Sequence, residues 1–198
     1  HHDGAATLNT GLQVKLADGW KIYWRSPGDA GLPPVLDFSQ NTDVSRHEMR
    51  FPAPERFTLF GLETFGYGKE VVFPLTLTLD QQATNSPAKN LTLVAAFSGL
   101  VCADLCIPVD EVLTLRIPSG TKSPSQHAFA IAQAEALVPS EGTSNGYHIT
   151  SARIAADQLD LVIANHSGDI FTMGEGDVLI ETDIPGLGFQ APQFGQGL

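Results

Sequence analysis

The 198-residue chain carries a formal net charge of −11, with 42% hydrophobic and 17% charged residues. The negative charge argues against nucleic acid and anionic lipid as partners, because both would be repelled, and favours a protein or a small molecule. No apolar run approaches the roughly 20 residues that span a bilayer, so we expect a soluble chain without direct membrane contact.

The N-terminal part of the chain shows the period-two alternation of β-strands. Residues 8–16 alternate regularly, and an aromatic-rich strand is expected at residues 20–25, with the tryptophans most simply packed in a core. Residues 26–34 hold three prolines and two glycines, which predicts an irregular loop. This loop could line a site or simply connect strands at the surface.

Residues 57–68 combine four aromatic residues with three glycines. Such a segment can act as a mobile lid that carries large apolar groups. It can also form a β-hairpin whose aromatic side chains pack on a sheet, and composition alone favours the hairpin.

The remaining pattern up to residue 118 is that of a β-sandwich with about eight short strands. A strand is expected at residues 71–79, where Pro74 indicates an edge strand or a bulge, and a polar loop at residues 80–90. Further strands are expected at residues 35–38, 44–51, 91–97 and 111–117.

A helix is expected after these strands, with Ser123 as its N-cap and Pro124 in its first turn. Its predicted apolar stripe comprises Ala128, Phe129, Ala132, Ala136 and Leu137. Alternation returns at residues 149–154, 159–163 and 178–182. We therefore predict an all-β protein with a β-sandwich that carries the cysteine pair at 1–120, a helical linker at 121–140, and a second, smaller or incomplete β-sandwich-like segment at 141–198.

Cys102 and Cys106 are the only cysteines, and they lie where one predicted strand turns into the next. Three interpretations remain open from spacing alone: a redox-active dithiol, a structural disulfide, and a two-thiolate site for a soft metal such as Cu(I). A ring of five residues gives roughly 2 kcal/mol in the chain-entropy model, so the pair would be a weak structural staple.

No other group of residues suggests chemistry. The sequence shows no Ser-His-Asp set and no Gly-rich phosphate loop, and its histidines lack ligand spacing, so we predict no cofactor and no histidine metal site. Asp104, Asp110 and Glu111 surround the cysteines. Because nearby carboxylates disfavour a thiolate, we expect thiol pKa values that are ordinary or raised. The scarcity of cysteine favours an oxidising compartment.

Four segments, in this order, resemble the N-terminal periplasmic region of the DsbD/ScsB family. They are GWKIYWRSPGDAGLPP at residues 19–34, PAPERF at 52–57, GLETFGY at 61–67 and VCADLCIP at 101–108. The resemblance covers roughly residues 8–118 and is closest to the ScsB-like branch, which is named for suppression of copper sensitivity.

The resemblance implies an immunoglobulin-like domain that acts as a protein-disulfide reductase. In this family, reducing equivalents pass through a membrane domain and a thioredoxin-like domain of the same full-length chain to the N-terminal domain, which reduces thioredoxin-fold proteins. Carried onto this sequence, Cys106 would form the mixed disulfide and Cys102 would resolve it. The location implied is the periplasm, as the soluble N-terminal part of an inner-membrane protein.

The resemblance also implies a cap over the disulfide. Phe65 would shield the sulfur atoms, Glu63 would be an acidic cap residue, and Tyr67 would complete the segment, while Tyr23 or Trp24 would lie beside the pair. Only three residues separate the cysteines here, fewer than in DsbD itself. Two alternatives remain: a copper-tolerance module that binds Cu(I) through the same thiolates, and an interaction sandwich with a structural disulfide.

Overall fold

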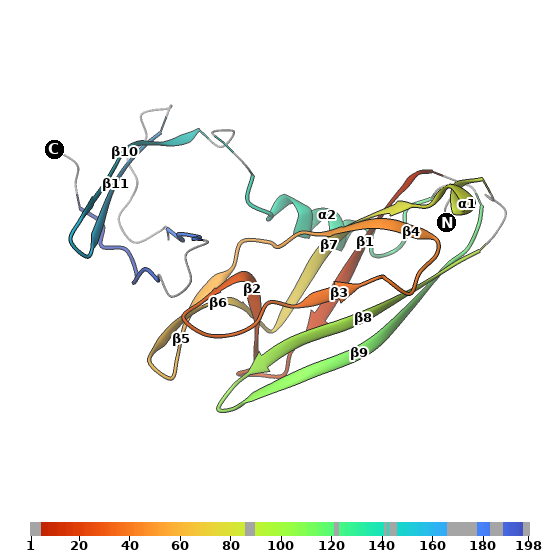
Figure 1. Ribbon diagram of the computed structural model, residues 1–198, viewed down its shortest axis with the longest axis horizontal. Helices are drawn as coiled ribbons and strands as arrows, with labels where there is room; N and C mark the ends of the chain where they lie inside the picture. Colours follow the sequence, from red (N-terminus) through yellow and green to blue (C-terminus); the bar gives the residue numbers. More distant parts are fainter. Residues whose placement is uncertain are drawn as a thin grey trace. The chain divides into compact units, whose positions relative to one another are not determined.

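The computed structural model describes residues 5–85, 90–120, 123–140, 142, 146–165, 178–182 and 188–195. The chain divides into two compact units, His1–Val138 and Pro139–Leu198 (Figure 1). Both cysteines lie in the first unit, whose strands and helices account for most of the described residues.

The strands of the first unit, in chain order, are β1 (Thr7–Lys15), β2 (Lys21–Gly28), β3 (Val35–Asp37), β4 (Val44–Met49), β5 (Glu55–Leu59), β6 (Leu62–Gly68), β7 (Glu70–Leu79), β8 (Leu91–Cys102) and β9 (Cys106–Ile117). Its helices are α1 (Gln81–Thr84) and α2 (Ala128–Ala136). The second unit contains β10 (Tyr147–Ala155) and β11 (Gln158–Asn165).

Two antiparallel sheets form the first unit. The smaller has the order β1-β7-β4, and the larger has the order β3-β8-β2-β6-β5 with β9 paired to β8. This is the immunoglobulin-like β-sandwich that the sequence predicts, and the all-β fold class is confirmed.

Aromatic side chains join the two sheets in the core. Phe73 of β7 is fully buried, and its ring lies edge-on to those of Tyr67 at 5.3 Å and Phe51 at 5.2 Å. The Tyr67 hydroxyl donates a hydrogen bond of 2.7 Å to the carbonyl oxygen of Pro52. Since edge-to-face aromatic pairs add to the free energy gained from burial, Tyr67 fixes β6 against the smaller sheet.

The expectation for Pro74 was wrong, because β7 is the central strand of the smaller sheet. The Pro74 carbonyl oxygen accepts a 2.8 Å hydrogen bond from the N–H of Arg50, one residue beyond the end of β4. In an antiparallel strand the N–H and C=O of one residue point to the same side. The missing N–H of Pro74 therefore falls where pairing with β4 ends, and a central strand tolerates it there.

Residues 57–68 adopt the hairpin alternative. β5 and β6 pair in regular register from Glu55↔Gly66 to Leu59↔Leu62. Phe60 and Gly61 form the two-residue turn, both with positive φ, of 52° and 78°. Such primed turns match the twist of the strands they join, and Gly61 adopts the required backbone without strain.

Helix α2 begins later than the sequence predicts and buries a different face. His127 is its N-cap, and in the preceding turn the His127 and Ala128 N–H groups donate hydrogen bonds to the hydroxyl and carbonyl oxygens of Ser125. Phe129 is 76% exposed, whereas Ala134 is buried. Ile131 lies against Gly11 of β1, and a side chain at position 11 would crowd the Ile131 side chain. The helix packs on β7 and β1, with Ile131 in the space beside Gly11.

The polar loop expected at residues 80–90 contains the single helical turn α1. In the second unit, β10 and β11 form the hairpin expected at residues 149–163. Residues 178–182 form no strand, contrary to the prediction. Neither helix in the described part of the chain has the length and hydrophobicity needed to cross a bilayer.

Candidate functional site: the cysteine hairpin

The two cysteines close the end of a long β-hairpin. The β8–β9 ladder runs without interruption from Leu91↔Ile117 to Cys102↔Cys106. Both strands therefore continue to the cysteines, beyond the limits that the sequence predicts. Ala103, Asp104 and Leu105 make the connection, in which the Ala103 N–H donates a 3.0 Å hydrogen bond to the Leu105 carbonyl oxygen.

Cys102 and Cys106 form a disulfide, with their Cα atoms 4.1 Å apart. The backbone ladder places the two residues opposite each other, so the geometry of the bond is built into the hairpin. After reduction the same ladder would keep the two thiols adjacent, which is what reversible formation of the bond requires.

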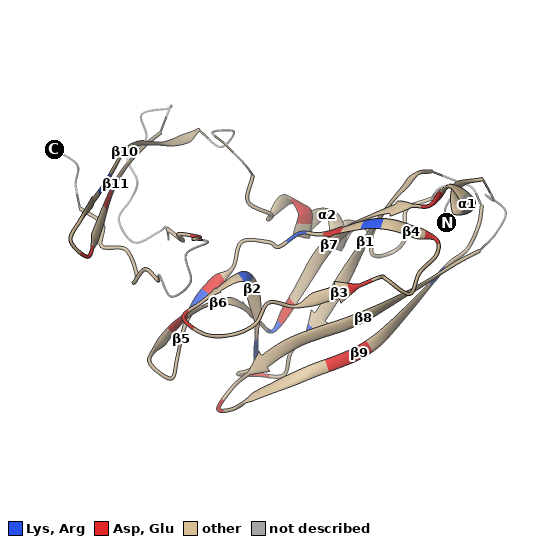
Figure 2. Ribbon diagram, viewed as in Figure 1, with Lys and Arg blue, Asp and Glu red and all other residues tan. Residues whose placement is uncertain are grey.

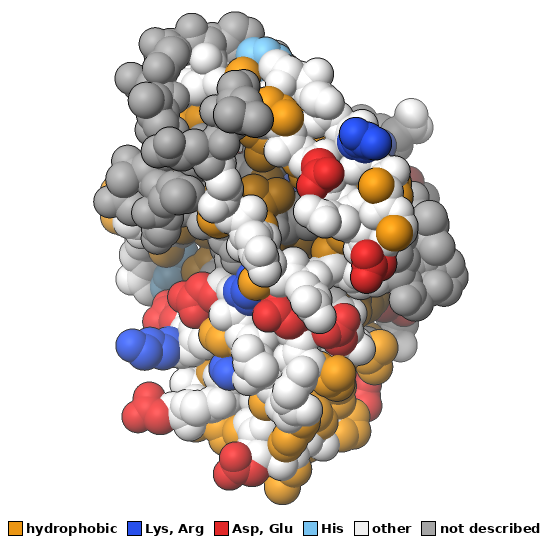
Figure 3. Space-filling model, turned by 90° about the vertical axis from the view of Figure 1, so that its left-hand side faces the viewer, with side chains coloured by type: hydrophobic (Ala, Val, Ile, Leu, Met, Phe, Trp, Pro, Cys, Tyr) orange, Lys and Arg blue, Asp and Glu red, His pale blue; other side chains and the backbone are white. Residues whose placement is uncertain are grey.

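The two sulfur-bearing residues differ sharply in exposure. Cys102 is 0% exposed, whereas Cys106 lies on the surface. Leu105 and Ile107, on either side of Cys106, are 56% and 42% exposed. The lower part of Figure 3, at the height of the hairpin tip, shows hydrophobic side chains gathered beside acidic ones. An incoming thiolate can therefore reach Cys106 far more easily than Cys102.

Strand β2 lies on the other side of β8, and Lys21 is directly opposite both Cys102 and Gly68. The Lys21 ammonium lies 4.3 Å from the centre of the Phe57 ring. Phe57 belongs to β5, which is separated from β2 by β6. The charged residues that lie near the cysteines in sequence are acidic: Asp104 is at the hairpin tip, and Asp110 and Glu111 are in the middle of β9 (Figure 2). The Lys21 charge is thus turned away from the disulfide.

Tyr23 is the predicted site residue that the register places nearest to Cys102. It follows Lys21 by two residues, so its side chain is on the same face of the sheet and diagonal to Cys102. Tyr23 is 2% exposed, and burial raises the pKa of its hydroxyl. Gly31, in the predicted irregular loop, lies so close to the Tyr23 ring that a side chain at Gly31 would collide with it. That loop therefore covers the face of the sheet that bears Cys102.

Trp24 lies in the irregular part of β2 that follows the paired residues. Its side chain is 4% exposed, and the guanidinium of Arg25 lies 4.8 Å from its ring. Burial agrees with the core role that the sequence favours for this tryptophan. The register does not bring it next to Cys102.

The three predicted cap residues all lie on β6. Phe65 is 8% exposed, under the Arg56 guanidinium at 4.8 Å, and Arg56 in turn forms an ion pair with Glu63. The backbone of Glu63 is tied to Asp29: its N–H donates to the Asp29 carboxylate at 2.9 Å, and its carbonyl oxygen accepts from the Asp29 N–H at 2.8 Å. Tyr67 is the core residue described above.

The register separates Phe65 from the disulfide. Cys102, Lys21 and Gly68 form one row across three strands, and Phe65 lies three residues further along β6. With standard strand dimensions its Cα is roughly 14 Å from that of Cys102, and an odd offset puts the two side chains on opposite faces. Shielding of the sulfur atoms by Phe65 stays a prediction, and it would require the β5–β6 hairpin to move.

Comparison with protein families gives a match over residues 5–118 to the model described as "Thiol:disulfide interchange protein DsbD, N-terminal". This match covers both sheets and the cysteine hairpin. The chain belongs to the DsbD N-terminal family.

Among solved structures, this DsbD-family chain is similar to the N-terminal periplasmic domain of ScsB from Proteus mirabilis. The TM-score is 0.60 at 29% sequence identity, over 88% of this chain and 62% of the ScsB chain. The reduced N-terminal domain of Neisseria meningitidis DsbD matches with a TM-score of 0.33 at 16% identity, over 56% of this chain and 77% of that one. No curated protein matches the chain.

The different exposure of the two cysteines escaped the sequence reasoning, as did the exposed side chains of Leu105 and Ile107. Two apolar residues at the tip of a predicted hairpin were the available signal, because such tips are normally polar. Burial of Cys102 had no local signal, since its neighbours on β2 are some 80 residues away in sequence.

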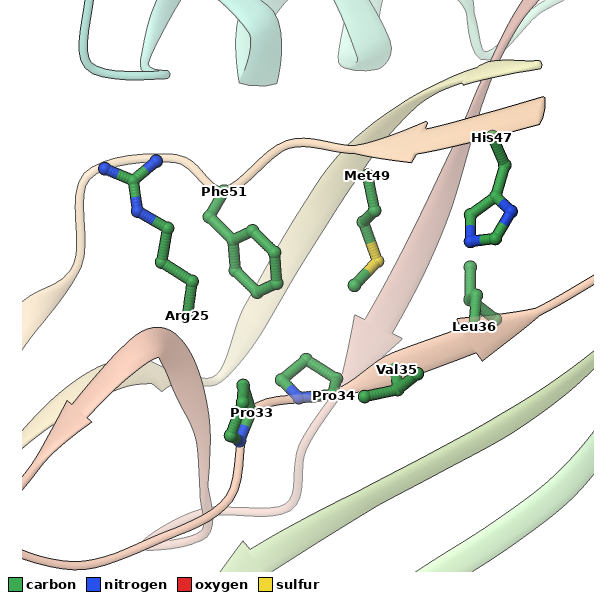
Figure 4. Close-up of a pocket in the computed structure, with 8 residues that line it drawn as sticks. All are labelled: Arg25, Pro33, Pro34, Val35, Leu36, His47, Met49 and Phe51. Carbon is green, nitrogen blue, oxygen red and sulfur yellow. The ribbon is translucent and has the colours of Figure 1, made fainter. Parts of the chain in front are cut away.

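Neither cysteine lines the pocket of about 310 Å³ shown in Figure 4. It is lined by Arg25, Pro33, Pro34, Val35, Leu36, His47, Met49 and Phe51. The predicted irregular loop thus contributes two prolines to a pocket wall. Among the described residues no group of three or more His, Cys, Asp or Glu side chains is placed to hold a metal ion. The cysteine hairpin remains the place where covalent chemistry is available.

Proposed function

We propose that this chain is a periplasmic thiol–disulfide exchange domain, which relays reducing equivalents from a membrane reductase to thioredoxin-fold proteins. One observation carries the proposal: a disulfide at a hairpin tip joins a fully buried Cys102 to an exposed Cys106. Membership of the DsbD N-terminal family and likeness to a periplasmic ScsB domain support it.

The exchange divides the two cysteines by role. In the reduced domain, the Cys106 thiolate attacks a disulfide of the partner, forms a mixed disulfide and releases one partner thiolate. The Cys102 thiolate then attacks the Cys106 sulfur, which restores the Cys102–Cys106 bond and releases the second partner thiolate. The partner gains two electrons, and two protons from solvent complete its thiols.

Recharging runs in the opposite direction. A thiolate of the upstream thioredoxin-like domain attacks the exposed Cys106 sulfur, and Cys102 leaves as a thiolate. The donor's second thiol then resolves the mixed disulfide, so the donor becomes oxidised and the domain holds two thiols. Leu105 and Ile107 flank the reacting sulfur and offer apolar contact to either partner.

We further propose that Glu63, Phe65 and Tyr67 limit access to the disulfide as the family's cap does. The Arg56–Glu63 ion pair and the Asp29–Glu63 hydrogen bonds hold this segment in its present position, away from the sulfur atoms. Capping would therefore require the β5–β6 hairpin to break these contacts and move toward the cysteine tip, and docking of a partner would reverse that movement.

The reduction potential of the pair tests the proposal directly. The domain is equilibrated against glutathione and dithiothreitol buffers, and free thiols are counted. A midpoint in the range of about −120 to −270 mV is expected for an exchange protein. A value below about −300 mV would indicate a structural disulfide and an interaction module instead.

Matched cysteine variants test the assignment of roles. Cys102→Ser retains the exposed thiol but cannot resolve, so it should accumulate a mixed disulfide with a thioredoxin-fold protein whose Cys-X-X-Cys pair is oxidised. Cys106→Ser keeps only the buried thiol and should trap none. Equal trapping by the two variants would overturn the assignment.

A further inference from the structure

Strand β9 forms an open border of the larger sheet. Within the described ranges it pairs with β8 on one side and with no strand on the other. Only Val109 and Ile117 are partly covered, and every other residue of the strand is exposed. We call residues 109–117 the β9 edge. Such an edge presents unpaired backbone groups to any strand that can align with it.

The outward-facing backbone groups belong to the even-numbered residues. A Cα separation of 4.1 Å between Cys102 and Cys106 is typical of an antiparallel pair that exchanges no backbone hydrogen bonds. Val94, opposite Thr114, directs its N–H at 2.9 Å and its carbonyl oxygen toward the side-chain amide of Asn41, away from β9. Because the two pair types alternate, the free N–H and C=O groups are those of Asp110, Val112, Thr114 and Arg116.

The β9 edge is complementary to itself about Leu113. If two copies pair antiparallel around a two-fold axis there, Asp110 of each lies opposite Arg116 of the other, and Val112 lies opposite Thr114. Leu113 meets its own copy, and Val109 meets Ile117. Glu111 opposite Leu115 is the one pair without complementarity. Opposite charges placed across a strand pair stabilise it, and apolar pairs do the same.

Other registers are poorer. Residues that face each other must share a face of the sheet. An even-numbered residue of one copy can therefore lie opposite only an even-numbered residue of the other. Centring on Val112 places Arg116 opposite Pro108, and centring on Thr114 places it opposite Val112. Centring on Glu111 places two glutamates face to face, which is destabilising. Only the register about Leu113 pairs the charges and also brings Pro108 opposite Pro118.

The two prolines set the ends of the paired segment. Proline has no N–H to donate, so Pro108 within β9 and Pro118 just after it stop pairing on both sides. Between these two prolines, every residue whose backbone groups face outward has an N–H group to donate. Prolines and charges often protect edge strands from association. Here the charges have opposite signs at symmetric positions, which favours one specific partner.

We infer that the β9 edge is a homodimer interface, in which residues 109–117 of two copies pair as antiparallel strands and join the two larger sheets. The occupant is a second copy of this chain, because the charges and the prolines of the β9 edge are complementary to those of an identical strand. The cysteine tip lies beyond the paired segment, so this inference does not depend on the exchange function.

The mass of the chain in solution, measured by sedimentation equilibrium over a wide range of concentration, tests the inference. The wild-type mass should rise from 21.1 kDa toward twice that value. Asp110→Arg or Arg116→Asp places like charges opposite each other and should weaken dimerisation about tenfold or more. The double variant Asp110→Arg, Arg116→Asp should restore it. Asp157→Arg makes the same charge change in the β10–β11 turn and should have no effect.

A second measurement covers the case in which a charge variant folds poorly. Leu113→Lys, at a position 37% exposed in the monomer, should also give a monomer, because two lysines would meet on the axis. In wild type, hydrogen exchange at the Val112 and Thr114 amides should slow as concentration rises. A wild-type chain that stays monomeric, or a double variant that fails to recover, would overturn the inference and leave the edge to another partner.

Discussion

Cys102 and Cys106 lie directly opposite each other at the end of the β8–β9 ladder, yet Cys102 is fully buried and Cys106 is exposed. Two residues whose Cα atoms are 4.1 Å apart thus have different access to solvent. The cause is position in the sheet, because β8 is flanked by β2 and β3 as well as β9, whereas β9 has β8 alone among the described strands.

This difference predicts unequal alkylation of the reduced domain. Cys106 should react with iodoacetamide at least about tenfold faster than Cys102, because a reagent reaches the exposed thiol without an opening of the structure. Mass spectrometry of peptides after brief labelling measures both rates. Similar rates in the folded domain would show that the exposure of the two residues changes on reduction.

Replacement of Phe65 by alanine distinguishes a role in shielding the disulfide from a role in core packing alone. Loss of a side chain that is only 8% exposed should lower the free energy of unfolding by about 3 kcal/mol. If Phe65 also shields the sulfur atoms, Phe65→Ala should speed reduction of the disulfide by dithiothreitol. Phe51→Ala is the matched control, since Phe51 is 9% exposed and lies in the aromatic core. An equal acceleration in both variants would refute the cap.

Gly66 permits the close approach of β2 and β6. A Cβ atom at this position would collide with the carbonyl oxygen of Ile22, which as part of the backbone cannot move aside. Gly66→Ala should therefore destabilise the domain by about 2 kcal/mol or more in urea unfolding. Gly68→Ala, on the same strand with open space around it, is the control and should change stability far less. Equal effects would point to backbone entropy instead of the collision.

Tyr67 should make the domain sensitive to alkaline pH. Burial raises the pKa of its hydroxyl well above the ordinary value of 10.0, so the neutral form is favoured in the folded state. A raised folded-state pKa contributes stability that is complete below the unfolded pKa and is lost as pH rises above about 10. Urea unfolding should show this loss, and Tyr67→Phe should reduce its slope.

The same variant has an effect at neutral pH. Tyr67→Phe removes the hydroxyl that donates to the Pro52 carbonyl oxygen and should cost about 1 to 2 kcal/mol. An unchanged free energy of unfolding at neutral pH would mean that water replaces the lost donor.

Local pattern was enough to predict much of the sandwich. Alternation located β1 and the strands on both sides of the cysteines, and the aromatic and glycine content of residues 57–68 favoured the hairpin that forms. These features depend on neighbours in sequence, which is why a single sequence carries them.

The predictions failed where the structure depends on residues that are distant in sequence. Pro74 is tolerated in a central strand because β4 ends beside it, and nothing near Pro74 in sequence says so. In α2, Ile131 packs beside Gly11 of the distant strand β1, whereas the large apolar Phe129 remains exposed. The cysteine pair was located from sequence and family resemblance, but the difference in exposure depends on β2.

The hairpin has a consequence for the lifetime of any complex with a partner. Its ladder holds the Cys102 thiol beside the Cys106 sulfur, so resolution of a mixed disulfide is intramolecular and proceeds at a high effective concentration. A partner joined to Cys106 would be released almost as soon as it is attached. Complexes of the wild-type domain should therefore be transient even where recognition is specific, and the turnover of the domain would be limited by encounter rather than by release.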